Sequence, residues 1–119
     1  MSHLPDILER HNEGDVMTLL LYVRPDLAFF RGHFPGLPIL PGVVQVDWAL
    51  CLASRYFQLP LSDFCGLKAL KFSAPVQPDT RLKLALHWKP DMRRLDFTYV
   101  DGDRKVSSGQ AVFGLKVAE

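Results

Sequence analysis

A histidine, a carboxylate and an uncapped helix start occur within fifteen residues of this sequence, at His33, Asp47 and Gly42. His33 stands where an expected extended piece gives way to a stiff loop, and an imidazole can act as a general base near neutral pH. A lone histidine in such a place is more often packed in the loop and hydrogen-bonded to the backbone. A catalytic role for His33 is therefore indicated only by the other groups near it in the sequence.

Asp47 falls inside an expected helix, where its neighbours one turn away are mostly apolar. If it is buried beside a cavity, the loss of hydration favours the protonated carboxyl, which can donate a proton at neutral pH. The alternative is a narrow solvated stripe at helical spacing, made of Asp47, Cys51, Ser54 and Gln58. The pattern leaves both possibilities open.

The start of this helix is the third element. Leu40, Pro41 and Gly42 precede Val43, and none of them has a side chain that caps the first N–H groups. Such a terminus can bind a carbonyl oxygen or a developing oxyanion, although water is the plain alternative. A base, an acid and an oxyanion site together suit removal of a proton next to a carbonyl with loss of a β-hydroxyl.

Two unusual segments must position these groups. Residues 32–42 hold three prolines and three glycines, which excludes a helix or an inner strand, yet the segment is apolar. Because loops are normally polar, it is expected to wall something buried. Residues 43–57 follow as the only long helix, apolar around most of its circumference, which predicts a central, buried helix.

The remaining pattern is mostly that of strands. Strands are expected at residues 16–23, 67–75, 80–88, 94–99 and 106–117, with a short helix at 4–10 and an extended piece at 28–33. Turn residues at 89–91 and 101–103 favour antiparallel neighbours. The prediction is one α+β domain, residues 1–119, with an antiparallel β-sheet wrapped around one long central α-helix.

Composition excludes several classes of function. The 119 residues are 48% hydrophobic and 23% charged with a net charge of +1, which gives no support to nucleic-acid binding. No signal-peptide pattern and no membrane-spanning run are present, so a cytoplasmic protein without membrane insertion is expected. Cys51 and Cys65 have neither metal-ligand nor disulfide spacing, and no metal or other cofactor is implied.

Residues 32–47, from Gly-His-Phe-Pro-Gly through Pro-Gly-Val-Val-Gln-Val-Asp, closely resemble the signature of the hot-dog-fold 3-hydroxyacyl-[acyl-carrier-protein] dehydratases of fatty-acid synthesis. The resemblance continues more weakly over residues 23–58 and 67–82, where residues 72–78 look like the family's strand entering its Pro-Val-x-Pro turn. The stretch 43–48 is more similar to compact stand-alone dehydratases of aryl-polyene and related lipid pathways.

The resemblance implies a hot-dog fold and a role for each site residue. His33 would abstract the α-proton, and Asp47 would protonate the departing hydroxyl. The Gly42 N–H would bind the thioester carbonyl, and the Ile39 carbonyl would orient the histidine. Phe34 is a further candidate for contact with the acyl chain. His33 and Asp47 would come from opposite subunits, which implies a homodimer or a higher homo-oligomer.

Two departures keep other functions open. The acid is Asp, as in the branch of the family that also isomerises its product, and Cys51 stands in the substrate site where the family often has Gln. The first alternative is therefore a non-catalytic subunit that binds an acyl chain or a partner dehydratase. The second alternative is an acyl thioesterase. The acidic acyl carrier protein would be met by a basic rim. Its candidates are Arg24, Arg31, Lys68, Lys71, Arg93 and Arg94.

Overall fold

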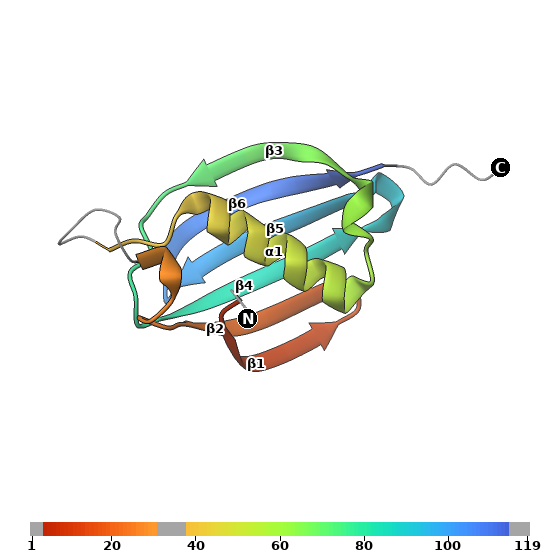
Figure 1. Ribbon diagram of the computed structural model, residues 1–119. Helices are drawn as coiled ribbons and strands as arrows, with labels where there is room; N and C mark the ends of the chain where they lie inside the picture. Colours follow the sequence, from red (N-terminus) through yellow and green to blue (C-terminus); the bar gives the residue numbers. More distant parts are fainter. Residues whose placement is uncertain (1–3, 31–37, 115–119) are drawn as a thin grey trace.

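One long helix lies across one face of a six-stranded antiparallel sheet in the structure, a computed structural model that describes residues 4–30 and 38–114 (Figure 1). The strands are β1 (Asp6–Glu13), β2 (Val16–Val23), β3 (Phe64–Phe72), β4 (Thr80–Lys89), β5 (Arg94–Asp101) and β6 (Arg104–Phe113). The helix α1 spans Gly42–Phe57, and short 3-10 turns occupy Ala28–Phe30, Leu61–Asp63 and Pro90–Met92. The sheet order is β1-β2-β4-β5-β6-β3, so β1 and β3 are its edges. This is the arrangement that the resemblance implies.

The core lies between α1 and the inner face of the sheet. Alternation along β4 places Leu82, Leu84 and Leu86 on that face, where they are completely buried. Trp48 of α1 is also completely buried and meets Phe29 edge-on, with ring centroids 6.4 Å apart. Full burial of one leucine stabilises the fold by about 2 kcal/mol, so this layer fixes how α1 sits on the sheet.

The predicted helix at residues 4–10 is wrong, because β1 occupies most of that range. Gly14, with φ +63°, and Asp15 form a two-residue turn that pairs Glu13 with Val16 and aligns β1 along β2. A residue with positive φ at such a turn is typical of a tight hairpin. Pairing with the neighbouring strand therefore overrides the local helical pattern.

The extended piece expected at 28–33 is also wrong where the structure describes it. Residues Ala28–Phe30 form a 3-10 turn in which the Phe30 N–H donates to the Leu27 carbonyl at 3.1 Å, while 31–33 lie outside the described residues. The strand predicted at 67–75 runs instead over β3. It ends at Phe72 because the N–H groups of Ser73 and Ala74 both donate to the Val106 carbonyl.

The other predicted elements are confirmed, with small shifts at their ends. The strand 16–23 coincides with β2, and those at 80–88 and 94–99 are β4 and β5 with one and two more residues. The strand expected at 106–117 begins two residues earlier, as β6, and ends at Phe113, while 115–117 lie outside the described residues. No helix in the described ranges is long and apolar enough to cross a membrane.

The helix is less buried than its apolar sequence predicts. The sheet covers one side of α1, whereas on the other side Val43 is 75% exposed and Asp47 is exposed as well. A sheet can contact only one side of a helix, so the remaining apolar side chains need another cover. This uncovered side of α1 carries the candidate acid.

Candidate active site

The first turn of α1 leaves two backbone donors without an acceptor in the described part of the chain. Pro41 precedes the helix and no side chain caps it, as the sequence predicts. The N–H groups of Val44 and Gln45 both donate to the Pro41 carbonyl, at 3.1 and 3.3 Å. Those of Gly42 and Val43 remain, and they are the groups that can bind an incoming carbonyl oxygen.

The ring of Phe72 explains why the helix begins with glycine. A Cβ at position 42 would lie 2.8 Å from Phe72 Cε1, far inside van der Waals contact. The two residues border a hollow of about 530 Å³ between the helix start and the end of β3. Its lining is mostly apolar and comprises Ile39, Leu40, Gly42, Gln45, Phe72, Ser73, Ala74 and Pro75. The expectation that the proline-rich loop walls a cavity holds for its described residues Ile39 and Leu40.

Asp47 and Cys51 lie together, one helical turn apart, but they do not line this hollow. The Cys51 thiol donates to Asp47 Oδ1 at 3.7 Å. Burial raises the pKa of the Cys51 thiol and the Asp47 carboxylate raises it further, so the thiol keeps the proton that it donates. Asp47 is therefore held by a neutral donor.

Within one chain, the helix shows the solvated stripe that the spacing allows. Asp47 and Gln58 are exposed, while Cys51 and Ser54 are half-buried. The Ser54 hydroxyl turns back to donate to the Leu59 carbonyl at 2.6 Å. A buried Asp47 thus requires a second surface that covers this side of the helix.

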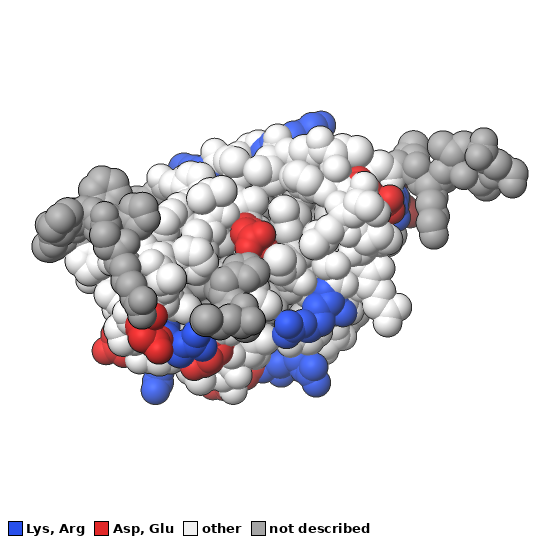
Figure 2. Space-filling model, in the orientation of Figure 1, with Lys and Arg blue, Asp and Glu red and all other residues white. Residues whose placement is uncertain are grey.

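Apolar side chains lie along the helix and β3 on the same side of the molecule. Val43 and Phe72 are 75% and 50% exposed, and Leu67 and Leu70 of β3 are also exposed. We call these four residues the open face. Figure 2 shows a mostly uncharged surface around one acidic group over α1, with basic side chains along the upper edge at β3 and more charged side chains along the lower side, toward β1. Large apolar patches on a protein surface usually mark an interface or a ligand groove.

The structure therefore separates the predicted residues into two groups. Ile39 and Gly42 meet at the hollow, and Asp47 and Cys51 lie toward the open face. His33 and Phe34 lie outside the described residues.

Sequence reasoning missed two residues of the site. Phe72 sets the space at Gly42, and Gln45 is a polar side chain of which only 2% is exposed. A signal for Gln45 was present, because its helical position shares the sheet-facing side with Trp48 and Ala49. A glutamine among core positions must find hydrogen-bond partners inside the protein.

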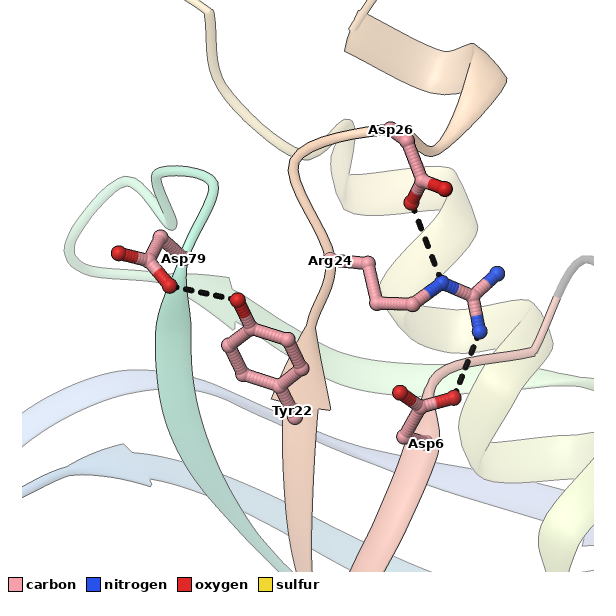
Figure 3. A network of polar contacts seen from close by, with 5 residues as sticks. All are labelled: Asp6, Tyr22, Arg24, Asp26 and Asp79. Carbon is pink, nitrogen blue, oxygen red and sulfur yellow. Dashed lines mark hydrogen bonds and ion pairs between the residues drawn. The ribbon is translucent and has the colours of Figure 1, made fainter.

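Three of the six candidates for a basic rim form ion pairs with acidic side chains of the same chain. Arg24 contacts Asp6 and Asp26 at 2.6 and 3.2 Å, next to the Tyr22–Asp79 hydrogen bond (Figure 3).

The other two arginines are engaged in the same way. Arg94 contacts Asp96 at 2.8 Å, and Arg93 lies 3.6 Å from Asp63 and over the ring of Trp88. Lys68 and Lys71 are exposed on β3 and form no ion pair within the described ranges, and Arg31 lies outside them. Of the five candidates in the described part of the chain, Lys68 and Lys71 thus remain available to an acidic partner.

Comparison with known proteins identifies relatives of this fold. A family model described as "ApeI-like: ApeI dehydratase" matches residues 9–110. The 3-hydroxyacyl-[acyl-carrier-protein] dehydratase FabZ of Nitratidesulfovibrio vulgaris (strain DSM 19637 / Miyazaki F) is 36% identical over 112 residues, with 83% of this chain and 72% of the relative covered.

Two solved structures are similar over nearly their whole length. The dehydratase heterocomplex ApeI:P from Xenorhabdus doucetiae matches with a TM-score of 0.83 and 32% identity, covering 93% of this chain and 98% of that one. An uncharacterized protein from Erwinia carotovora subsp. atroseptica matches with a TM-score of 0.76 and 35% identity, covering 91% and 94%. The expected hot-dog fold is confirmed.

Proposed function

We propose that this chain, which belongs to the ApeI-like family of dehydratases, removes water from a 3-hydroxyacyl group carried as a thioester on acyl carrier protein, giving the trans-2-enoyl thioester. The family assignment makes the chain a hot-dog dehydratase of lipid biosynthesis and an enzyme of the hydro-lyase class. It also confirms the resemblance to the aryl-polyene type. The substrate carrier and the roles of individual residues are our proposals.

The observation that carries the proposal is the uncapped start of α1 at Gly42, which opens on the apolar hollow. A thioester carbonyl that accepts from the Gly42 N–H becomes a better electron sink, which makes the α-proton more acidic. His33 takes that proton, with the Ile39 carbonyl orienting its ring, and Phe34 contacts the acyl chain. Asp47 gives a proton to the β-hydroxyl, which leaves as water, and Cys51 holds the Asp47 carboxyl.

We propose that two copies of the chain complete the site by pairing through β3. The two sheet edges differ in balance, since β1 carries four exposed charged side chains and one large exposed apolar one, whereas β3 carries two exposed lysines and three large exposed apolar side chains. Charge on an edge strand discourages pairing with another chain. A second copy against the open face would cover Asp47 and bring His33 of one copy to Asp47 of the other. The relative from Xenorhabdus doucetiae is described as a heterocomplex, so a different subunit at this face is the alternative.

Lys68 and Lys71 are our candidates for contact with the acidic carrier protein. They pair with Gln110 and Ser108 of β6 and share the outer side of the sheet with them, away from α1. Pairing of two β3 edges leaves that side uncovered. Long-range attraction to an acidic partner speeds association and weakens with added salt.

The test is to give the purified chain a 3-hydroxyacyl-acyl carrier protein and to follow the loss of one water by mass spectrometry. We expect turnover by the wild type, and a loss of about 100-fold or more in His33→Ala and Asp47→Asn, because general acid–base groups commonly supply that much. Wild-type turnover no greater than that of His33→Ala would refute the proposal. Release of free carrier thiol without an enoyl product would identify a thioesterase, and acyl binding without turnover would identify a non-catalytic subunit.

A further inference from the structure

We infer that Gln45 is a positioning residue, whose buried amide holds the Leu40 carbonyl and so aims the functional backbone groups of Ile39 and Gly42. This inference rests on the proposed function, which assigns those two backbone groups their roles. It concerns a side chain that touches no reacting atom.

The amide of Gln45 connects the loop before the helix to the interior of the sheet. Its Oε1 accepts a hydrogen bond from Ser107 Oγ of β6 at 2.6 Å, and its Nε2 donates to the Leu40 carbonyl at 3.4 Å. Its backbone carbonyl accepts from the Tyr99 hydroxyl of β5, also at 2.6 Å. Gln45, Tyr99 and Ser107 are all buried, so the network lies away from water.

Only one orientation of this amide satisfies both neighbours. Ser107 can donate through its hydroxyl, whereas the Leu40 carbonyl can only accept. Reversing the amide would place Oε1 against the Leu40 carbonyl oxygen, acceptor against acceptor. The Leu40 carbonyl therefore fixes the orientation of the amide, and the Ser107 hydroxyl donates to the amide oxygen in that orientation.

Leu40 is held through both of its backbone groups. Its N–H donates to the Val76 carbonyl at 2.7 Å, and its carbonyl accepts from Gln45 alone among the described donors. Leu40 is also 2% exposed, which excludes water as an easy replacement. The distance of 3.4 Å is longer than that of a strong N–H···O bond, so this contact contributes little to stability by itself.

The residues on either side of Leu40 carry the groups that the reaction needs. Ile39 precedes it with the carbonyl that would orient His33, and Gly42 follows two residues later with the N–H that would hold the thioester. The Leu40 carbonyl belongs to the peptide that lies between the one with the Ile39 carbonyl and the one with the Gly42 N–H, so a change in its direction alters the dihedral angles next to both groups. Displacements of about 1 Å at a reacting centre can cost about 100-fold in rate.

The experiment compares two changes at the same buried cluster. Gln45→Leu removes the amide and with it the hold on Leu40, whereas Tyr99→Phe removes only the hydroxyl that bonds to the helix backbone. Gln45→Leu loses two buried hydrogen bonds and Tyr99→Phe loses one, so both are expected to lower the Tm. Turnover of the 3-hydroxyacyl thioester and amide hydrogen exchange of the peptide that contains Leu40 are measured on each, with the wild type alongside.

We expect Gln45→Leu to lower kcat about tenfold with little change in KM, because an oxyanion donor acts mainly in the transition state. Tyr99→Phe should keep kcat within about twofold of the wild type. The double variant Gln45→Leu/Ser107→Ala removes both partners of the Ser107–Gln45 hydrogen bond, so no buried hydroxyl is left unpaired there. Compared with Gln45→Leu, it should regain part of the lost Tm but none of the lost kcat. Equal kcat losses in Gln45→Leu and Tyr99→Phe, or recovery of kcat with Tm, would overturn the inference.

Amide exchange separates failure of this inference from failure of the proposed function. A wild type without turnover refutes the function alone. In that case, faster exchange at Leu40 in Gln45→Leu but not in Tyr99→Phe still supports the inference that the Gln45 amide fixes the position of Leu40. Exchange at Leu40 that is the same in all proteins overturns it, whatever the activity.

Discussion

Position 42 favours glycine because a neighbouring side chain leaves no space for a Cβ, and not because of its backbone dihedral angles. The residue begins α1 in a helical conformation that any amino acid adopts, and it is the Phe72 ring that leaves no room for a Cβ. We predict that Gly42→Ala lowers turnover about tenfold or more, since the added methyl must displace the ring that borders the hollow.

Replacing Phe72 in the same protein makes that prediction specific. In Gly42→Ala/Phe72→Leu the new methyl group no longer meets the ring, so turnover should recover part of the way to that of Phe72→Leu alone. The measurement is kcat for the four proteins of the cycle. A double variant as slow as Gly42→Ala would show that crowding by Phe72 is not the cause.

Cys51 is a thiol whose pKa depends on its burial and on one charged neighbour. Burial and the Asp47 carboxylate both raise the pKa of Cys51, so it should be alkylated slowly by iodoacetamide at pH 8.5. Asp47→Asn removes the charge, and we predict a faster reaction at Cys51 with no change at the exposed Cys65, measured by peptide mass spectrometry. An unchanged rate at Cys51 would contradict the contact between the two side chains.

Between β4 and β5, an ion-pair cluster makes stability depend on pH. Asp96 of β5 contacts Arg94 and Lys89 at 2.8 and 3.0 Å. Burial alone would raise the pKa of Asp96, but these two cations outweigh it and the pKa is lowered. A carboxyl with a lowered pKa stabilises the fold above the unfolded value of about 4 and loses that contribution as the pH falls through the folded value.

Asp96→Asn should therefore unfold more easily than the wild type at pH 7, by about 0.5–1 kcal/mol for a partly exposed pair. The difference should shrink as the pH falls from about 4 to 2. Urea unfolding at several pH values measures it. A difference that stays constant down to pH 2 would mean that the charge of Asp96 does not stabilise this pair of strands.

Elements with a clear periodic pattern could be predicted from sequence, and those set by distant partners could not. α1 and β2 match their predicted ranges to within one residue, since their patterns of apolar residues were unambiguous. β1 failed because its strand conformation depends on pairing with β2 through the turn at Gly14. The close approach of Phe72 to Gly42 likewise joins residues thirty positions apart, which no local pattern contains.

The described chain is one half of a site if Asp47 works as proposed. Under the proposed function a second copy covers the open face and the exposed Asp47, and β3 offers an apolar edge for it. We predict that Leu70→Lys on β3 converts the protein to monomers and removes turnover, because a buried, unpaired ammonium is costly. Leu8→Lys is the matched control, since Leu8 is an equally exposed leucine on the opposite edge strand. Light scattering after size exclusion separates the outcomes, and a dimer that persists in Leu70→Lys would contradict the pairing.

The most direct measurement uses a mixed dimer of His33→Ala and Asp47→Asn, co-expressed with different tags and purified through both. Each parent variant should be inactive. In the mixed dimer, one of the two sites combines an intact His33 with an intact Asp47 from the other copy, so about half of the wild-type water loss per dimer is expected from the two-fold symmetry. A mixed dimer as inactive as its parents, beside an active wild type, would contradict a site shared between two copies.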